Sequence, residues 1–245
     1  MSHNIEIKEG AFLIADAHFS HQRPELFSLI EAIHSKKLQP TQLILMGDLF
    51  DALFGSITFT LETNTKILSL INDISEFIEV IYLEGNHDFN LKEVFPKAKV
   101  FTIANQPVMC TYKDKTVCLA HGDFTGDFLY KIYTSIVRNP SVLKVLNSFD
   151  NMINHYILKK LDNYLSKKDD CKEFTGFREY MQKRLSNRVT CQYFIEGHFH
   201  QNRSLDLENF KYINLGAFAC NQRYFIVNSL QDKELLKENI FSKET

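Results

Sequence analysis

The stretch Glu84–Phe89 (EGNHDF) constrains the fold most, because it places three reactive side chains directly after an apolar run. The run from Phe77 to Leu83 is rich in Ile and Val, which predicts a β-strand. The glycine that follows would let the chain turn sharply there. Asn86 offers an amide oxygen to a hard metal ion, and His87 exchanges protons near neutral pH. Asp88 can fix the tautomer of a neighbouring histidine. Alone, the stretch is equally typical of a polar turn.

Similar polar stretches follow other predicted strands, and together they favour a functional site over a turn. Residues i and i+2 of an extended chain face the same side, so Asp-x-His and His-x-His pairs can each hold one ion. Open α/β folds place ligands at the carboxyl ends of their strands. The four further runs and the residues that end them are Gly10–Ala15 before Asp16 and His18, Gln42–Met46 before Asp48, Thr116–Ala120 before His121, and Cys191–Ile195 before His198 and His200.

The candidate metal ligands are carboxylates, imidazoles and one amide, with no thiolate among them. This mixture suits Mn, Fe or Zn better than Ca or a structural cysteine-type zinc site. One such motif has little meaning, but five at predicted strand ends are hard to explain as histidines of the core. The candidates are Asp16, His18, Asp48, Asn86, His121, His198 and His200.

The segments between the first three motifs alternate strand and helix, which favours a parallel sheet. Apolar spacing predicts helices over Pro24–Lys37 and about Glu62–Glu76. Beyond them, Lys99–Thr111 is predicted as strand and turn, with a hairpin turn at Lys113–Lys115. The runs Lys211–Leu215 and Arg223–Val227 are expected to close the sheet.

The pattern becomes helical between Phe124 and Arg188. Apolar residues recur at helical spacing on both sides of Asn139-Pro140, where the helix should break. An insertion of this length exceeds an ordinary connection between strands. Two interpretations stay open: a helical pair packed on the core, or a cap over the site that offers apolar surface to a hydrophobic substrate.

Composition restricts the setting. A length of 245 residues and a hydrophobic content of 44% allow one large α/β domain. The net charge of -2 gives no argument for nucleic acid or for anionic membrane surfaces. Five cysteines without a Cys-x-x-Cys pair predict reduced thiols in a cytosolic protein. Because Met1–Gly10 lacks an apolar signal core and no apolar run is long enough to span a bilayer, we expect a cytoplasmic protein.

Taken together, the five motifs resemble the signature of the calcineurin-like metallophosphoesterases. That family signature reads Asp-x-His, Gly-Asp, Gly-Asn-His-Asp/Glu, His and Gly-His-x-His. The resemblance implies an α/β sandwich of two mixed β-sheets flanked by helices, in a single domain of residues 1–245 with a helical cap insertion at about 124–188. It also implies a dinuclear metal centre. One ion would be held by Asp16, His18 and His200, the other by Asn86, His121 and His198, with Asp48 bridging them.

Within that superfamily, the chain is most similar to the UDP-2,3-diacylglucosamine hydrolases of lipid A biosynthesis. The similarity rests on Ile14–Asp16, Gly47–Asp51, Gly85–Phe89, His121–Asp123, Leu215–Phe218 and the helical insertion. It implies hydrolysis of UDP-2,3-diacylglucosamine to UMP and 2,3-diacylglucosamine 1-phosphate (lipid X). It further implies two divalent cations, with Mn ahead of Fe or Zn, and transient peripheral contact with the inner membrane.

The same resemblance assigns roles to individual side chains. His87 and Asp88 would be catalytic, and the substrate contacts would come from Asn86, His87, Asp127 and His198. The chain departs from the family at two places. Many members carry Arg at the position of His87, and further acidic residues where this chain has Gly55-Ser56-Ile57.

Two other functions stay open. One is a calcineurin-like phosphodiesterase that acts on a nucleotide or another phosphodiester; the near-neutral charge and the lack of a basic stripe argue against a nuclease. The other is a non-catalytic scaffold of the same fold, as in a retromer subunit. A scaffold should have lost metal ligands, and this sequence retains all of those expected.

Overall fold

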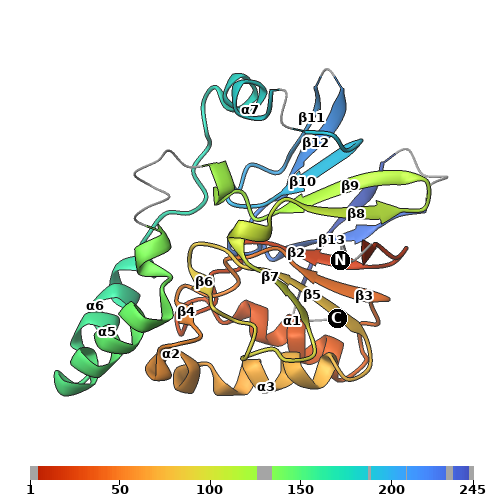
Figure 1. Cartoon of the computed structure of the whole chain (residues 1–245). Coiled ribbons are helices and arrows are strands. Elements are labelled where there is room, and N and C mark those ends of the chain that lie inside the picture. Colours follow the sequence, from red (N-terminus) through yellow and green to blue (C-terminus); the bar gives the residue numbers. More distant parts are fainter. Residues whose placement is uncertain (1–4, 126–133, 187–188, 208, 230–233, 243–245) are drawn as a thin grey trace.

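Two six-stranded β-sheets lie face to face in the computed structural model, which describes residues 5–125, 134–186, 189–207, 209–229 and 234–242 (Figure 1). The first sheet is mixed, with parallel pairs at β1-β8, β9-β10 and β10-β12 and antiparallel pairs at β8-β9 and β11-β12. In spatial order its strands are β1 (Ile5–Glu6), β8 (Val108–Tyr112), β9 (Lys115–Ala120), β10 (Tyr193–Glu196), β12 (Phe210–Asn214) and β11 (Arg203–Leu207).

The second sheet is also mixed, and four of its strands run parallel to one another. Its strands in spatial order are β14 (Leu236–Ile240), β13 (Arg223–Val227), β2 (Phe12–Ile14), β3 (Gln42–Leu45), β5 (Glu79–Leu83) and β7 (Lys99–Phe101). Helix α1 (Glu25–His34) joins β2 to β3, while α2 (Thr58–Thr63) and α3 (Thr65–Ile74) lie between β3 and β5. The expected β-α-β-α-β alternation and the sandwich of two mixed sheets are therefore confirmed.

Some predicted elements differ in detail from those observed. The helix expected near Glu62–Glu76 is two helices that meet at Asn64. Lys99–Thr111 contains one strand of each sheet, separated by a 3-10 turn at Ile103–Asn105. The last two predicted strands also lie in different sheets, because Leu215–Ala217 and the short helix α8 (Phe218–Asn221) carry the chain across. The hairpin around Lys113-Asp114 is confirmed, since Tyr112 pairs with Lys115.

Apolar side chains of both sheets meet in the centre of the sandwich. Strands β2, β3 and β5 are buried along most of their length, which explains why their sequences are continuous apolar runs and do not alternate. The central layer includes Leu13, Ile44 and Ile81 from the second sheet and Leu119, Ile195 and Ile213 from the first. A second layer joins α1 and α3 to the outer face of the second sheet, and α7 (Phe177–Leu185) covers the first.

In the helical insertion, residues 134–137 are helical and are followed by α5 (Pro140–Met152), α6 (Tyr156–Leu165) and then α7. Asn139 begins α5, because its side chain accepts hydrogen bonds from the backbone amides of Ser141 and Val142, and Pro140 follows as the first helical residue. Helices α5 and α6 lie beside the small parallel sheet of β4 (Leu53–Phe54) and β6 (Asp88–Phe89) (Figure 1). Within the described ranges, no helix combines the length and apolarity needed to span a bilayer.

The cysteine prediction is wrong for four of the five thiols. Cys118 is bonded to Cys191 and Cys171 to Cys220, whereas Cys110 is free and buried. The fold brings the Cα atoms of the two pairs to 6.0 and 5.8 Å, within the range that a disulfide spans. The paired residues lie 73 and 49 positions apart, so spacing along the sequence did not reveal them.

A small apolar cluster docks the insertion on the core, and Leu143→Ala should weaken it. Leu143 is buried against Ile57 and Phe89. Truncating a buried leucine costs about 2–5 kcal/mol, so amides of α5 and α6 should exchange with solvent at least about 20-fold faster. Hydrogen exchange read by mass spectrometry measures this. Val145→Ala, on an exposed face of the same helix, is the control. Equal exchange in both variants would show that Leu143 does not dock the insertion.

Candidate metal centre

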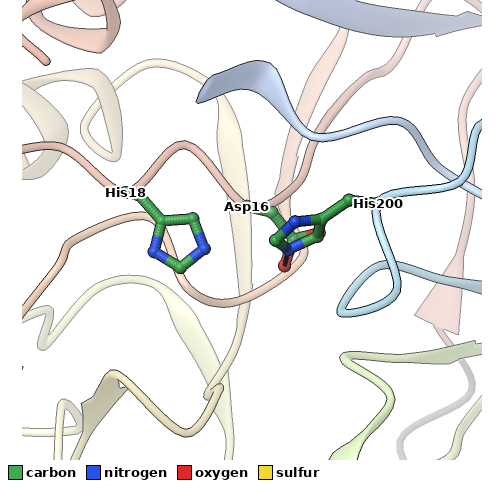
Figure 2. A group of neighbouring side chains, drawn as sticks. All are labelled: Asp16, His18 and His200. Carbon is green, nitrogen blue, oxygen red and sulfur yellow. Dashed lines mark ion pairs between the residues drawn. The ribbon is translucent and has the colours of Figure 1, made fainter. Parts of the chain in front are cut away.

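The predicted metal ligands converge where strands of both sheets end. Asp16 and His18 follow β2, Asp48 follows β3, His121 follows β9, and His198 and His200 follow β10. They form two groups within which the ligand atoms all lie within 4.8 Å of one another. Asp16, His18 and His200 form the first group (Figure 2), and Asp48, His121 and His198 form the second. The first group contains the residues that the sequence resemblance implies for one ion, and the second contains His121 and His198, which it implies for the other.

The backbone at these strand ends is unusual. Asp16, His18, Asp48, His198 and His200 all have positive φ angles, between 45° and 62°. Residues other than glycine rarely adopt this conformation, and it persists where surrounding contacts hold it. At Asp16 one such contact is clear, because its two carboxylate oxygens accept hydrogen bonds from the His198 amide at 3.0 and 2.9 Å. The strand ends of the two sheets are therefore tied together directly.

Two glycines are required by close approach between these strand ends. A Cβ at Gly85 would lie 2.2 Å from Oδ1 of Asp48, and one at Gly197 would lie 2.4 Å from Oδ2 of Asp16. The role expected for Gly85 was a sharp turn, but it is not among the glycines with positive φ. Its function is to let the Asp48 carboxylate approach the backbone.

In the first group, neighbouring oxygens orient the imidazole rings. Nδ1 of His200 lies 2.5 Å from the Asp170 carbonyl oxygen, so that nitrogen carries the proton and Nε2, 3.1 Å from Oδ1 of Asp16, is available as a ligand. Nδ1 of His18 lies 3.4 Å from Oδ1 of Asp51. Both ring nitrogens of the buried His18 lack a hydrogen-bond partner among the described residues. A buried imidazole of this kind, next to a carboxylate and a second imidazole, fits a divalent cation.

The second group has the same construction. Nδ1 of His121 lies 3.1 Å from the carbonyl oxygen of Met46, and Nε2 lies 3.3 Å from Oδ2 of Asp48. Oδ1 of Asn86 lies 3.4 Å from the same Nε2, next to this group, and its role as a ligand stays a prediction. The ring of His198 meets that of His121 edge to face at 5.0 Å. The bridging position of Asp48 stays a prediction.

Burial and close charges set the proton affinities of the site. Burial opposes ionisation of Asp16, but the neighbouring His200 outweighs it and lowers the pKa of the carboxyl group. Burial likewise opposes the charge on His200, but Asp16 raises the pKa of that ring to about 9. Burial and the nearby His121 lower the pKa of His198 to about 3. A proton therefore competes with a metal ion for His200 at neutral pH, and much less so for His198.

Asp88 has a different role from the expected contact with a histidine ring. Its Oδ1 accepts hydrogen bonds from the amides of Gly85 at 2.8 Å and Asp48 at 3.0 Å. Its Oδ2 accepts from the Leu49 amide at 2.7 Å and from the Tyr82 hydroxyl at 2.6 Å. Burial raises the pKa of Asp88 to about 7. The Asp88 carboxylate binds backbone amides next to the candidate ligands. It reaches them because the chain bends back into β6 directly after Asn86 and His87.

His87 lies beside the first group without belonging to it. Its amide donates to Oδ1 of Asp48 at 2.8 Å, and its ring meets that of His18 edge to face at 5.1 Å. Nδ1 lies 2.9 Å from the carbonyl oxygen of Asp51. Because a carbonyl only accepts, Nδ1 carries the proton and Nε2 is the nitrogen that can exchange one. This arrangement is compatible with the predicted catalytic role of His87.

Several residues that orient the ligands were not found from the sequence. Asp51 ends the Gly47–Asp51 motif, and its carboxylate binds Arg23. Arg23 directly precedes the helix predicted from Pro24. Both residues therefore lie in or next to a motif or element that the sequence indicates. Gln106 accepts from the His121 amide at 2.6 Å, and Asp170 contacts His200, but no local pattern marks either. The predicted substrate contact Asp127 lies outside the described residues.

Comparisons with known proteins agree with this geometry. A UDP-2,3-diacylglucosamine hydrolase from Pseudomonas fluorescens is 29% identical over 153 residues, which cover 61% of this chain and 61% of that protein. The enzyme of the same name from Pseudomonas putida is 28% identical over 153 residues, covering 61% and 63%. The matches thus span less than two thirds of these relatives.

Solved structures show weaker likeness. An archaeal phosphodiesterase has a TM-score of 0.46 at 13% identity, covering 94% of this chain and 99% of its own. A phosphoesterase from E. coli has a TM-score of 0.45 at 13% identity, with coverage of 95% and 99%.

The family profile described as Calcineurin-like phosphoesterase matches residues 12–202, a range that contains every candidate ligand from Asp16 to His200. Both ligand groups that the profile brackets are assembled in the structure, and the fold implies divalent metal ions there. The chain belongs to the calcineurin-like phosphoesterase family.

Proposed function

We propose that this chain is a dinuclear metal-dependent phosphoesterase. The observation that carries the proposal is the pair of adjacent ligand groups, each with one buried carboxylate and two imidazoles. Asp16, His18 and His200 would hold one ion, Asn86, His121 and His198 would hold the other, and Asp48 would bridge them. When bound, two such ions activate water and stabilise negative charge on a phosphoryl group. Manganese is our first candidate, with iron or zinc as alternatives.

The protein's own contribution is to prepare this site. The carbonyl oxygens of Met46 and Asp170 keep Nε2 of His121 and His200 available as ligands. With two carboxylates against two divalent cations, the site would keep roughly two positive charges and attract a phosphodiester or diphosphate. His87 is placed next to the first group to stabilise an equatorial oxygen or to protonate the leaving group.

As substrate we propose UDP-2,3-diacylglucosamine, with cleavage to UMP and 2,3-diacylglucosamine 1-phosphate. Support comes from the names of the similar curated proteins and from the insertion. Its helices leave large apolar side chains in solvent, among them Phe149 at 54%, Tyr156 at 63% and Met152 at 82% exposure. A surface of this kind suits acyl chains, whose burial is worth roughly 0.8 kcal/mol per CH₂. The insertion would then be a cap, with transient contact to a membrane that holds the substrate.

A panel of three substrates tests the proposal. Purified protein with added Mn²⁺ should hydrolyse UDP-2,3-diacylglucosamine faster than bis-p-nitrophenyl phosphate, and both faster than cyclic AMP. Preference for cyclic AMP would favour the alternative phosphodiesterase function. No turnover of any substrate with two ions bound would favour the non-catalytic scaffold.

Metal content gives the first test of the residues. The protein should bind two transition-metal ions per chain, and Asp48→Ala should reduce metal content and activity most, because the proposed bridge contacts both ions. Elemental analysis after dialysis measures the stoichiometry. Glu79→Ala, which removes a partly exposed carboxylate on β5 that pairs with lysines, is the control. Full activity with one ion or none would contradict the dinuclear site.

Replacing His87 separates catalysis from metal binding. His87→Ala should lower kcat by about 10²–10⁴-fold, as expected for loss of an acid or charge stabiliser, while both ions stay bound. His87→Arg should retain more activity, since a cation still meets the phosphate. Steady-state kinetics with parallel metal analysis distinguishes the two effects. If His87→Ala turns over like the wild type, the residue serves only as a neighbour of Asn86.

The cap is tested by shortening its apolar surface. Phe149→Ala or Tyr156→Ala should raise KM for the diacylated substrate and leave bis-p-nitrophenyl phosphate hydrolysis unchanged, because that compound has no chains to bury. Phe77→Ala, an exposed phenylalanine after α3 and outside the insertion, is the matched control. Proportional loss on both substrates would instead assign α5 and α6 to the structural core.

A further inference from the structure

We propose that Arg23 is a positioning residue that couples the helical insertion to the first ligand group; the inference rests on the proposed dinuclear site. The Arg23 guanidinium donates from Nη2 to Oδ1 of Asp51 at 2.7 Å and from Nη1 to Oδ2 of Asp170 at 2.6 Å. Nη2 also donates to the carbonyl oxygen of Leu165, the last residue of α6, at 3.2 Å. One side chain thus joins the core to the segment that leaves α6.

Both carboxylates that Arg23 binds belong to residues in contact with ligands of the same ion. Asp51 places Oδ1 3.4 Å from Nδ1 of His18, and Asp170 places its carbonyl oxygen 2.5 Å from Nδ1 of His200. The two carboxylates are 2% and 3% exposed, and the Arg23 side chain is 17% exposed. Charge-assisted hydrogen bonds of a planar guanidinium are directional, and burial strengthens them. The orientation of both rings therefore depends on one cation.

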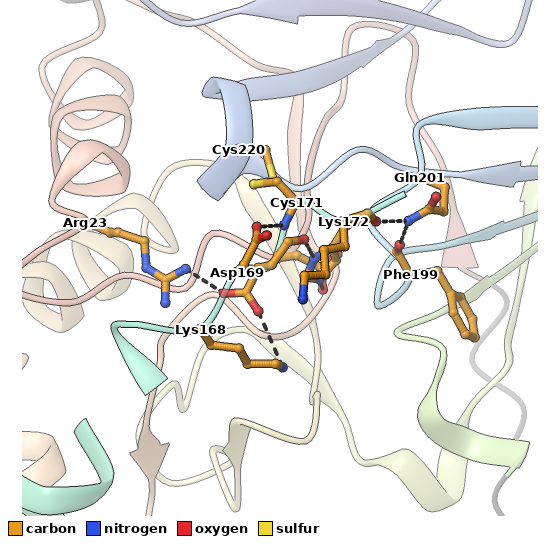
Figure 3. Close-up of a disulfide and its surroundings, with 11 residues drawn as sticks. Arg23, Lys168, Asp169, Cys171, Lys172, Phe199, Gln201 and Cys220 are labelled. Atoms are coloured by element: carbon orange, nitrogen blue, oxygen red, sulfur yellow. Dashed lines mark hydrogen bonds and ion pairs between the residues drawn. A yellow bond between two sulfur atoms is a disulfide. The ribbon is translucent and has the colours of Figure 1, made fainter. Parts of the chain in front are cut away.

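Other attachments hold the same segment, so loss of Arg23 should misalign it without releasing it. The disulfide Cys171–Cys220 ties it to α8 (Figure 3). In α8, the Ala219 amide donates to the carbonyl oxygen of Asp16 at 3.1 Å. The Gln201 side chain donates to the Lys172 carbonyl oxygen at 2.9 Å and accepts from the Phe174 amide at 2.7 Å. Among the described residues, neither the disulfide nor Gln201 contacts the Asp51 carboxylate. Arg23, in contrast, binds both Asp51 and Asp170.

Lysine at this position should not replace arginine. A guanidinium presents donors in a fixed fork, whereas an ammonium is a point charge on a flexible stem. The chain also offers a matched control, because Nζ of Lys168 lies 3.4 Å from Oδ1 of Asp170, whereas Arg23 binds Oδ2 of the same carboxylate. Lys168 is half exposed, and among the contacts of the described residues it pairs with Asp170 and not with Asp51. Removing it deletes a positive charge beside Asp170 and leaves the connection to Asp51 intact.

The experiment measures stepwise Mn²⁺ affinity by calorimetry for wild type, Arg23→Gln, Arg23→Lys and Lys168→Met, with thermal unfolding of each. Arg23→Gln should weaken one of the two binding steps about 10–100-fold, as expected when groups that orient metal ligands are lost, and leave the other unchanged. Arg23→Lys should be intermediate, and Lys168→Met should match the wild type. In turnover of bis-p-nitrophenyl phosphate, kcat of Arg23→Gln should recover partly at high Mn²⁺.

The outcomes separate the inference from the function on which it rests. Wild-type affinity at both steps in Arg23→Gln, or equal weakening of both with a lower Tm, would overturn the positioning role. If Arg23→Gln does not fold, Asp170→Asn replaces it, because that change keeps the carbonyl contact to His200 but removes the charged partner of Arg23. Asp170→Asn should weaken the same step, and an unchanged affinity would overturn the inference. A wild-type protein that binds fewer than two ions would overturn the proposed function instead.

Discussion

The Asp88 carboxylate is the interaction on which the rest of the site depends. It accepts hydrogen bonds from three backbone amides at the ends of β3 and β5, and from the hydroxyl of Tyr82 within β5. Those amides flank Asp48 and precede Asn86, so one buried acid defines the positions of two candidate ligands. A buried carboxylate is costly unless its oxygens are satisfied, and here the cost is offset by a network that also determines the loop conformations. Function and local folding are therefore served by the same contacts.

The sequence predicted the fold class and pointed to the candidate ligands because both leave local patterns. Continuous apolar runs marked the buried strands β2, β3 and β5, and polar candidate residues followed each of them. The extended backbone assumed for Asp16 and His18 is not observed, because both residues have positive φ angles. Strands β1, β4, β6, β11 and β14 were missed, since they are short, lie at an edge or carry many polar residues. Asp88 was expected to meet a histidine because sequence spacing does not show that the chain bends back into β6.

Contacts between distant segments were beyond sequence reasoning for a different reason. Asp170 reaches His200 through a backbone carbonyl, a group that every residue carries, so its identity gives no signal. Gln106 holds the His121 amide from a loop in which no apolar period or motif singles it out. The disulfides likewise depend on which strands become neighbours. These contacts follow from the topology, and they can be identified only when the positions of the two sheets are known.

The separation of the ligands along the chain has a consequence for how the protein is made. Asp16 and the His198 amide that binds it are 182 residues apart, and the two sheets that carry them are complete only when β12 and β14 have joined. A nascent chain that stops before β10 would therefore contain Asp16, His18, Asp48, Asn86 and His121 but lack His198 and His200, one imidazole of each group. Ions that bind the native arrangement alone shift the folding equilibrium by mass action. Metal ions would then stabilise the fold only after β10 and the histidines that follow it have been synthesised.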